Sequence, residues 1–358
     1  MLIGIDASRT TVAHRTGTEA YALNLIRTLL AAGVDHRWRL YYRQSPISFL
    51  ISPENRVENR VIRMPRLWTH IGLAAETARR PPDGLFIPAH ARPLWCRVPT
   101  VVTVHDLGYV HFPEAHPRRQ RAYLDWSTRH SARRSARLIA DSQATRNDLT
   151  RFYGTPPEKV SVVYPGFDST PFAQTTAQPA GLPTEYLLYV GTIQPRKGLL
   201  PLLDALARVP NAPPLLLAGR EGWLSEQIRQ RVSELDLESR IRFLGYVSDE
   251  ELPALYAGTT AFVLPSLYEG FGFPVLEAMA AGAPVLCSDG GSLPEVAGDA
   301  ALVTPAGDVD ALVDGLRRIL SDSPLRAHLV ERGHEQVKRF SWDKAAAETL
   351  ALLENAFQ

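Results

Sequence analysis

The sequence predicts an α/β protein made of two successive domains, each built on a parallel sheet. Short apolar stretches typical of buried strands alternate with longer stretches of helical character, which is the pattern of parallel βαβ units. The pattern stops in a stretch rich in Pro, Ser, Thr and Gln at residues 169–184, and then starts again. A length of 358 residues is sufficient for two domains of ordinary size.

The first domain is expected over residues 1–168. A helix is predicted over 19–30, where apolar residues recur with the helical period, and a long basic helix over 118–135. Buried strands are predicted at 2–5, 38–42, 57–64, 84–87, 100–104, 138–141 and 160–163.

The second domain is expected over residues 185–340, with 169–184 as the linker. Strands are predicted at 186–190, 214–218, 241–243, 261–264, 284–287 and 301–303. Helices are predicted at 198–208, 224–235, 250–257, 275–281, 309–320 and 324–339, with a final helix at 342–357.

The composition is that of a globular protein, with 45% hydrophobic and 22% charged residues. No apolar run reaches the ~20 residues that a membrane-spanning helix needs. The N-terminus begins like a buried strand and lacks the basic region of a secretory signal. Cys96 and Cys287 fit no metal or redox spacing, so a reducing, cytoplasmic location is expected.

Net charge is only +1, but it is distributed unevenly along the chain. Residues 1–168 contain 24 Lys and Arg against 14 Asp and Glu, and the rest of the chain contains 15 against 24. The basic first half indicates an anionic partner, either a phosphate-bearing acceptor or an anionic membrane surface. The alternative is that the two halves attract each other. Nucleic acid is not an expected partner.

Two carboxylates, Glu269 and Glu277, are separated by eight positions across a Gly-rich turn. The turn lies between a predicted strand and a predicted helix. Pro274 suits the first helical position, which would place Glu277 in the first turn beside free backbone N–H groups. Carboxylates on both sides of such a loop can accept hydrogen bonds from vicinal diols, as binding a nucleotide sugar requires. A surface loop followed by a dipole-favouring acid is the structural alternative.

A second motif runs from Gly191 to Gly198 and follows a predicted strand directly. Arg196 and Lys197 place two cations together in its turn. A diphosphate leaving group needs such a pair, because two adjacent anionic groups must be neutralised. A solvated basic turn is the alternative.

Further polar residues follow predicted strands of both domains. His105 and Asp106 end an apolar strand, where the imidazole could bind a sugar hydroxyl and Asp106 could orient the ring or contact the acceptor. In the loop after the first strand, Gly17 permits close approach to a phosphate and Thr18 can cap the next helix. No His-Glu-x-x-His, Asp-x-Asp or Gly-x-Ser-x-Gly pattern suggests a metal or a serine nucleophile at these loops.

The stretch from Glu269 to Glu277 resembles the Glu-x7-Glu motif of retaining glycosyltransferases of family 4, which have the GT-B fold. Gly191 to Gly198 resembles the family's Gly-x5-Lys-Gly segment, and His105-Asp106-Leu107 resembles its His-Asp-Leu segment. The first half is most similar to bacterial mannosyltransferases that build O-antigen-type polysaccharide.

The resemblance implies two Rossmann-like parallel-sheet domains facing a cleft, with a C-terminal helix at 341–358 that returns to the first domain. It implies transfer of a hexose from a nucleotide sugar to a saccharide or lipid-linked acceptor, without a metal or other cofactor. GDP-mannose is the leading donor and UDP-sugars come next. Peripheral contact with the inner face of a membrane is compatible with the basic first domain.

The resemblance also implies roles for individual residues. The catalytic set is His105, Asp106, Arg196, Lys197 and Glu269. The donor-binding set is Gly17, Thr18, Arg196, Lys197, Arg220, Tyr246, Val247, Phe271, Gly272 and Glu277. A UDP-sugar epimerase of the same fold and a non-catalytic subunit of a glycosylation complex are the alternative functions. The first would favour a more acidic first domain, and the complete set of two acids and two cations argues against the second.

Overall fold

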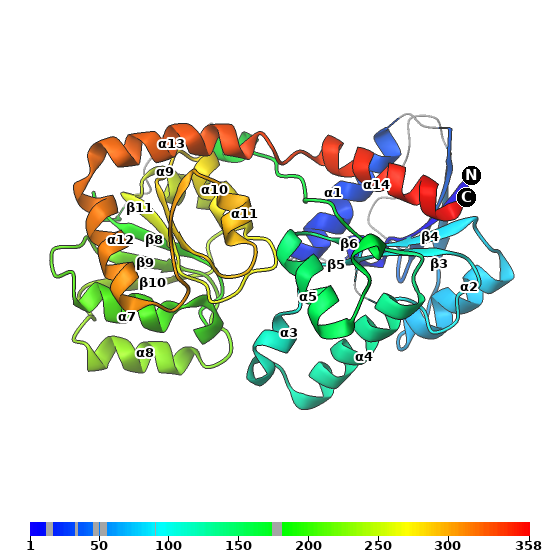
Figure 1. The fold of residues 1–358 in the computed structure, drawn as a ribbon, viewed down its shortest axis with the longest axis horizontal. Helices are drawn as coiled ribbons and strands as arrows, with labels where there is room; N and C mark the ends of the chain where they lie inside the picture. The colour runs from blue at the N-terminus through cyan, green and yellow to red at the C-terminus, as the bar shows by residue number, and fades with distance from the viewer. Residues whose placement is uncertain (12–16, 33–34, 46–49, 51–55, 90, 174–180) are drawn as a thin grey trace. The chain divides into compact units, whose positions relative to one another are not determined.

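A computed structural model of the chain describes residues 1–11, 17–32, 35–45, 50, 56–89, 91–173 and 181–358. The chain forms two compact units, each built on one parallel sheet with helices on both faces (Figure 1). The first unit contains residues 1–166 and 340–358, and the second contains residues 167–339. The predicted α/β class with two Rossmann-like sheets is confirmed. None of the helices in the described ranges has the length and apolar character that crossing a membrane requires.

The sheet of the first unit has seven strands in the order β3-β2-β1-β4-β5-β6-β7. The strands are β1 (Leu2–Asp6), β2 (Arg37–Tyr42), β3 (Val57–Val61), β4 (Gly84–Ile87), β5 (Thr100–Val104), β6 (Arg137–Ala140) and β7 (Val160–Val162). All neighbouring pairs are parallel. The strand order reverses between β1 and β4, and doubly wound sheets bind ligands at such a point, beyond the carboxyl ends of the strands.

In the first unit, the sequence did not predict the helices between β3 and β4 or the short helix after β5, whereas it did indicate a helix start after β6. The helices are α1 (Gly17–Ala31), η2 (Trp68–Leu73), α2 (Ala74–Arg79), α3 (Gly108–His111), α4 (Arg118–Arg134), α5 (Gln143–Tyr153) and α14 (Trp342–Phe357). Short turns are η1 (Ser8–Thr11), η3 (Pro113–Ala115) and η4 (Pro157–Lys159). The ends of α5 carry clear sequence signals, since the Ser142 hydroxyl accepts from the backbone of Thr145 and Gly154 is left-handed with φ of 62°.

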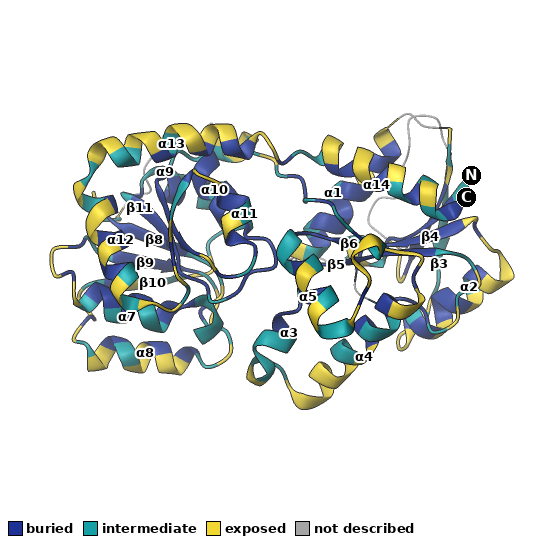
Figure 2. Ribbon diagram, viewed as in Figure 1, coloured by how far each residue is buried: buried dark blue, intermediate teal, exposed yellow. Residues whose placement is uncertain are grey.

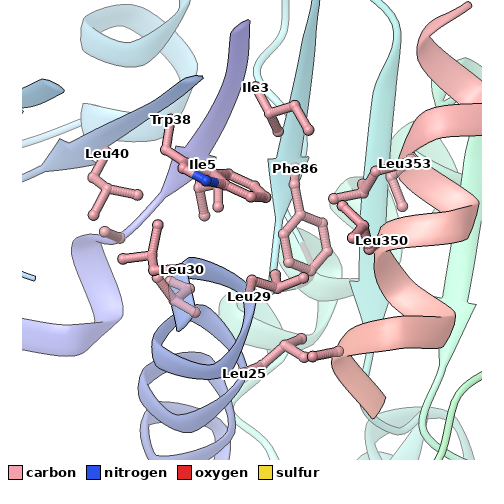
Figure 3. Close-up of a cluster of buried hydrophobic side chains, with 14 of the residues drawn as sticks. Ile3, Ile5, Leu25, Leu29, Leu30, Trp38, Leu40, Phe86, Leu350 and Leu353 are labelled. Atoms are coloured by element: carbon pink, nitrogen blue, oxygen red, sulfur yellow. The ribbon is translucent and has the colours of Figure 1, made fainter. Parts of the chain in front are cut away.

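Two apolar layers cover the two faces of the first sheet. Because side chains alternate along a strand, Phe86 contributes to one layer while Leu85 and Ile87 contribute to the other. Helices α1 and α14 close the Phe86 layer, and Figure 3 shows Leu350 and Leu353 of α14 beside it. Helices α4 and α5 contribute to the opposite layer. The C-terminal helix thus packs on the first unit, as expected.

Two glycines let α14 and its start approach the first unit closely. A Cβ atom at Gly84 in β4 would overlap the ring of Phe357, and one at Gly166 would overlap the backbone of Trp342. Any larger residue at Gly84 or Gly166 would push α14 away from the rest of the unit. The two glycines therefore fix both ends of α14 against this unit.

The sheet of the second unit has six strands in the order β10-β9-β8-β11-β12-β13, again all parallel. The strands are β8 (Leu187–Val190), β9 (Leu215–Ala218), β10 (Ile241–Gly245), β11 (Ala261–Leu264), β12 (Val285–Ser288) and β13 (Ala301–Thr304). The helices are α6 (Thr170–Ala173), η5 (Pro195–Lys197), α7 (Leu199–Ala207), α8 (Ser225–Glu234), α9 (Leu252–Ala257), α10 (Phe273–Ala280), α11 (Leu293–Ala297), α12 (Val309–Ser321) and α13 (Ser323–Val337).

Helices cover both faces of this sheet, with α12 packed on α7 and α13 packed on α10. Strands β9, β11 and β12 are buried at every position, while the outer sides of α8 and α13 are exposed (Figure 2). Continuous burial on both faces explains why these strands are uninterrupted apolar runs. The strand order reverses between β8 and β11.

The stretch predicted as a linker begins with a short helix that belongs to the second unit. Helix α6 packs against α9 and α10, and the ring of Phe172 lies 5.9 Å from the ring of Tyr256. The aromatic side chain provides the apolar contact that a solvated linker would lack. Residues 174–180 of the predicted linker lie outside the described part of the chain.

Candidate functional site

Lys197 and Glu269 form an ion pair at the point where the strand order of the second sheet reverses. Lys197 lies in the turn after β8 and Glu269 in the loop after β11. The Nζ of Lys197 is 2.5 Å from Oε1 of Glu269, and the side chains are only 14% and 11% exposed. The two predicted motifs, 72 residues apart in sequence, therefore meet where doubly wound sheets bind ligands.

Backbone contacts hold these two loops together. The backbone N–H of Leu267 donates to the carbonyl of Arg196 at 3.0 Å, and the Arg196 guanidinium donates back to the carbonyl of Tyr268 at 2.9 Å. Gly198 is left-handed, with φ of 69°, and a Cβ atom there would overlap the carbonyl oxygen of Pro265. The glycine is required both for the backbone conformation and for the close contact.

The carboxylate of Glu269 is stabilised in its charged form. Burial alone raises its pKa, but the positive charges of Lys197 and Arg196 and hydrogen bonds from Lys197 and Ser266 bring that pKa below its ordinary value. The hydroxyl of Ser266 donates to Oε1 at 2.6 Å. Glu269 is thus an ionised acceptor at neutral pH.

Ser292 fixes the backbone between Glu269 and α10. Its hydroxyl donates to the carbonyl of Phe271 at 2.6 Å, and its backbone N–H donates to the carbonyl of Glu269 at 3.1 Å. Gly272 precedes α10 with φ of 109°, and a Cβ atom there would come within 2.8 Å of Leu293. Phe271 itself is buried. The loop therefore has one well-defined path from the acid to the helix.

Glu277 lies deeper in α10 than predicted. The helix begins at Phe273, so Pro274 is its second residue and Glu277 its fifth. The prediction that Glu277 lies in the first turn beside free N–H groups is wrong. Gly272 takes the capping position in a left-handed conformation, which lets the helix start before the proline. The backbone N–H of a fifth helical residue already has a carbonyl partner one turn earlier.

The carboxyl group of Glu277 is buried beside a tyrosine. The hydroxyl of Tyr256 donates to its Oε2 at 2.8 Å. Burial raises the pKa of Glu277 to about 7, with the hydrogen bond from Tyr256 acting against this rise and the charge of Asp249 adding to it. The two predicted acids thus differ in charge state near neutrality, because Glu269 has two cations beside it and no cation among the described residues acts on Glu277.

The ends of β9 and β10 complete this edge of the second sheet. The backbone N–H of Gly219 donates to the carbonyl of Gly245 at 2.7 Å. The guanidinium of Arg220 lies over the ring of Tyr246, 4.6 Å from its centroid, and Tyr246 is 62% exposed. Val247 is half-buried beside it. An exposed aromatic ring with a cation over its face can accommodate a flat, polar group.

In the first unit, His105 is a buried histidine paired with Asp141. Its Nδ1 lies 2.6 Å from Oδ2 of Asp141, and its Nε2 lies 3.2 Å from the carbonyl oxygen of Pro88. Burial lowers the pKa of His105, but Asp141 and the other hydrogen bonds outweigh that effect and raise it above the ordinary value. The edge of the ring packs against Tyr21, with centroids 4.8 Å apart.

The sequence had suggested that Asp106 could orient the ring of His105, but the carboxylate that pairs with the ring is that of Asp141. Asp106 follows His105 directly, but its Oδ1 accepts from the backbone N–H of Gly108 at 2.8 Å and so shapes the start of α3. Asp141 follows β6, the strand next to β5, and this adjacency brings it to His105. Its position at a strand end was the available signal.

Gly17 and Thr18 lie at the start of α1. Gly17 is exposed, and a Cβ atom there would have no described residue within 4 Å beyond its chain neighbours. Thr18 is already the second residue of the described helix, so it is not the N-cap that the sequence predicted. Arg15 and Thr16 of the same loop lie outside the described residues. The next residue, Glu19, is buried and accepts from Arg9 at 3.2 Å.

Within the described ranges, no group of three His, Cys, Asp or Glu residues is placed to hold a metal ion. The expected cofactor-free reaction stays a prediction. Arg196, Lys197, Glu269 and Glu277, together with the glycine-shaped loops around them, lie on one edge of one sheet.

Two Rossmann-like units, the second with an acid-and-cation cluster at this edge of its sheet, have the architecture of the GT-B fold. Residues 15–170 match the family described as Glycosyltransferase Family 4, and residues 175–336 match the one described as Glycosyl transferases group 1. The chain belongs to glycosyltransferase family 4, and it is an enzyme of the glycosyltransferase type.

Individual relatives agree with this assignment. O-antigen chain mannosyltransferase B of Escherichia coli is 32% identical over 370 residues, covering 94% of this chain and 95% of that protein. The MMP alpha-(1->4)-mannosyltransferase of Mycolicibacterium hassiacum is 33% identical over 245 residues, covering 63% of this chain and 55% of that protein. Among solved structures, sucrose-phosphate synthase of Thermosynechococcus elongatus has a TM-score of 0.79 at 24% identity, covering 99% of both chains. That last similarity concerns the fold.

Proposed function

We propose that this chain is a retaining mannosyltransferase that moves mannose from GDP-mannose to a saccharide or lipid-linked acceptor in polysaccharide synthesis. The observation that carries the proposal is the similarity to an O-antigen chain mannosyltransferase along nearly the whole chain. The ion pair of Lys197 and Glu269 at the reversal point of the second sheet supports it.

The diphosphate of the donor would be bound by Arg196 and Lys197. Both lie in one short turn, and phosphate oxygens are strong acceptors for guanidinium and ammonium groups. An ammonium group has three N–H donors, so Lys197 can keep its contact with Glu269 and still reach a phosphate oxygen. Its positive charge is then shared between the two anions.

The two acids would bind the two ends of the donor. Glu269, already ionised, would accept hydrogen bonds from the transferred sugar, with the backbone of Phe271 and Gly272 beside it. Glu277 would bind the ribose hydroxyls from its place on α10. The exposed ring of Tyr246, with Arg220 over it and Val247 next to it, would receive the nucleobase.

Transfer would take place on the front face of the sugar. The bond from the anomeric carbon to the β-phosphate oxygen breaks, and a bond to the acceptor oxygen forms on the same face. The acceptor proton passes to the departing phosphate oxygen, so no protein nucleophile and no metal is required. Positive charge on Arg196 and Lys197 stabilises the leaving diphosphate as its charge grows.

The first unit would bind the acceptor. Contacts to the acceptor would come from His105 at the end of β5 and from Gly17 and Thr18 after β1. Asp106 would act indirectly, because its carboxylate accepts from the Gly108 N–H and so shapes the start of α3. A cytoplasmic location, at or near the inner face of a membrane, fits the basic character of this unit. An epimerase acting on UDP-sugars remains the second candidate, supported only by the shared fold.

A donor panel tests the proposal. The protein is incubated with GDP-mannose, UDP-glucose and UDP-N-acetylglucosamine, and release of the nucleoside diphosphate is measured with and without an oligosaccharide acceptor. GDP-mannose is expected to give the highest rate, and NMR of the product is expected to show the anomeric configuration of the donor. An inverted product or preferential turnover of a UDP-sugar contradicts the proposed mechanism or donor.

A further inference from the structure

A basic groove of about 790 Å³ lies on the first unit, outside the residues already assigned. Its walls come from the segments that follow β1, β2 and β3, together with α4. The lining residues are Ser8, Arg9, Thr11, Arg43, Gln44, Arg63, Met64, Pro65, Arg66, Leu67, Trp68, Thr69, His70 and Tyr123. The groove thus lies along the edge of the sheet at which parallel α/β folds bind ligands, and its volume suits a small organic ligand.

Positive charge dominates this groove. Four arginines line it, and no carboxylate is found among its described lining residues. Arg9 is paired with Glu19 just outside the lining. Arg63 and Arg66 are exposed and form no ion pair with any residue that the structure describes. Among the described residues, the positive charge of the groove is therefore compensated only in part, so the groove attracts an anion.

The shape of the groove is fixed by backbone contacts. The guanidinium of Arg43, after β2, donates to the carbonyl of Pro65, after β3, and so joins two walls. Leu67 has a left-handed backbone with φ of 55°, a rare conformation for a bulky residue, and its side chain is 61% exposed. Strained backbone of this kind concentrates at binding sites. The groove is a built feature of the loops and not only a cluster of surface charges.

One wall of the groove is aromatic. The hydroxyl of Tyr123 lies 2.9 Å from Nε2 of His70, and Tyr123 is 45% exposed. The His70 ring also packs edge-on against Trp126, with centroids 5.4 Å apart. Tyr123 and Leu67 together give the groove an apolar surface beside its arginines. The carbon-rich face of a sugar ring can cover such a surface and exclude water from it.

We propose that this groove binds a phosphate or diphosphate group attached to the saccharide acceptor, with Arg63 and Arg66 as its main contacts. The proposal rests on the proposed function, because it assigns the acceptor class for that transfer. Guanidinium groups bind phosphate oxygens through paired N–H donors. Two exposed arginines that have no ion-pair partner among the described residues can neutralise both charges of a diphosphate. The saccharide would lie against Tyr123 and Leu67.

Binding of inorganic pyrophosphate tests the groove directly. The donor site is first filled with GDP, so that Arg196 and Lys197 are occupied, and pyrophosphate is then titrated calorimetrically. The double variant Arg63→Gln/Arg66→Gln is expected to bind pyrophosphate at least tenfold more weakly than the wild type. Arg133→Gln/Arg134→Gln is the matched control, since these arginines are exposed and lie about 15 Å further along α4 than Tyr123. The control is expected to bind within twofold of the wild type.

Vesicles identify the source of the phosphate. Phosphatidylcholine vesicles carrying a polyprenyl diphosphate are expected to bind the wild type, and free pyrophosphate is expected to displace them. Vesicles of phosphatidylcholine with phosphatidylglycerol are expected to bind more weakly and to resist displacement. Equal binding to both vesicle types, undisturbed by pyrophosphate, overturns the proposal in favour of a general anionic surface contact.

Thermal unfolding of the double variant separates lost binding from lost folding. An unchanged midpoint is expected, because both arginines are exposed. Pyrophosphate affinity that is the same in the wild type and a folded double variant overturns the proposal. The donor panel remains an independent measurement. Nucleotide release without pyrophosphate binding rejects this groove alone, whereas no turnover of any donor rejects the proposed function and leaves the binding result standing.

Discussion

The ammonium group of Lys197 contacts the carboxylate of Glu269 at 2.5 Å, inside a site that leaves little of either side chain exposed. Because neither charge is fully hydrated, the charged form of each side chain is stabilised by the other. Removing a single partner leaves the other as an uncompensated buried charge. The pair therefore links the group assigned to the leaving diphosphate with the group assigned to the transferred sugar.

Lys197→Ala is expected to lower kcat more than it weakens donor binding. Charge on the diphosphate grows toward the transition state, so the lost cation acts differentially, with an effect on the order of 10²–10³-fold. Steady-state kinetics with GDP-mannose measures both parameters. Lys338→Ala, which removes the lysine of an exposed ion pair with Glu335, is the control and is expected to leave both unchanged. Near wild-type turnover in both Lys197→Ala and Arg196→Ala would reject the assigned phosphate site.

Glu277→Gln and Glu269→Gln are expected to have different effects on GDP binding. Glu277 is assigned to the ribose, so its loss weakens binding of both GDP and GDP-mannose. Glu269 is assigned to the sugar, so its loss reduces transfer and donor selectivity while GDP binds almost as before. Calorimetric titration with GDP distinguishes the two. Equal losses of GDP affinity in both variants would show that the acids do not divide the ligand in this way.

Binding of a nucleoside is expected to strengthen as the pH rises from 6 to 8. Glu277 has a pKa of about 7 in the unliganded protein, and only its ionised form accepts hydrogen bonds from both ribose hydroxyls. Guanosine is the suitable ligand, because it has no phosphate that titrates in this range. Tyr256 and Asp249 face Glu277, and neither is altered in the test variant. Glu277→Gln is expected to bind guanosine with no such pH dependence, and a dependence that persists in this variant assigns the effect to another group.

The stability of the ligand-free protein is expected to change with pH in the opposite direction, and again through Glu277. Its pKa is raised above the unfolded value, so the folded protein holds a proton that the unfolded chain has lost between about pH 4.5 and 7. The contribution of Glu277 to stability therefore falls as the pH rises through this window and stays constant above it. Urea unfolding of the ligand-free Glu277→Gln variant is expected to show a smaller decrease over the same range.

Asp141→Asn is expected to destabilise the protein more at pH 5.5 than at pH 8.5. The raised pKa of His105 means that its protonated form stabilises the fold, fully below pH ~6.5 and less as the pH passes the folded value. Loss of the buried partner at low pH costs on the order of 3 kcal/mol. At high pH the amide oxygen can accept the same imidazole N–H. Urea unfolding at both pH values measures the difference, and an equal loss at both would show that His105 does not titrate against Asp141.

The sequence predicted the strands of both sheets because each is an apolar run between polar loops. It did not predict η2 and α2, where the helix begins after the left-handed Leu67 with no side-chain cap. It also misplaced Glu277 in its helix, because a left-handed Gly272 moved the start of α10 before Pro274. In both places, the residue at which the helix begins depends on the backbone conformation of one preceding residue. The residue types around that position do not predict this conformation.

Site residues that belong to a short sequence motif could be predicted. Site residues that come together only through the order of the strands could not. Arg196, Lys197 and Glu269 were singled out, and the fold brings them together. The pairing of His105 with Asp141 depends on the adjacency of β5 and β6, across 36 residues. The groove depends on arginines from three loops that the order β3-β2-β1 places side by side. Such groupings follow from strand order, which the local pattern of residues does not specify.

Because Phe357 packs directly on Gly84, the first unit cannot complete its core until the C-terminal helix has been synthesised. The core of the first unit needs residues 340–358, yet the ribosome produces all of residues 167–339 before them. The second unit is continuous in sequence and can finish folding first. Until α14 emerges, the layer around Phe86 lacks the side chains of Leu350, Leu353 and Phe357, so the nascent chain exposes an apolar surface there.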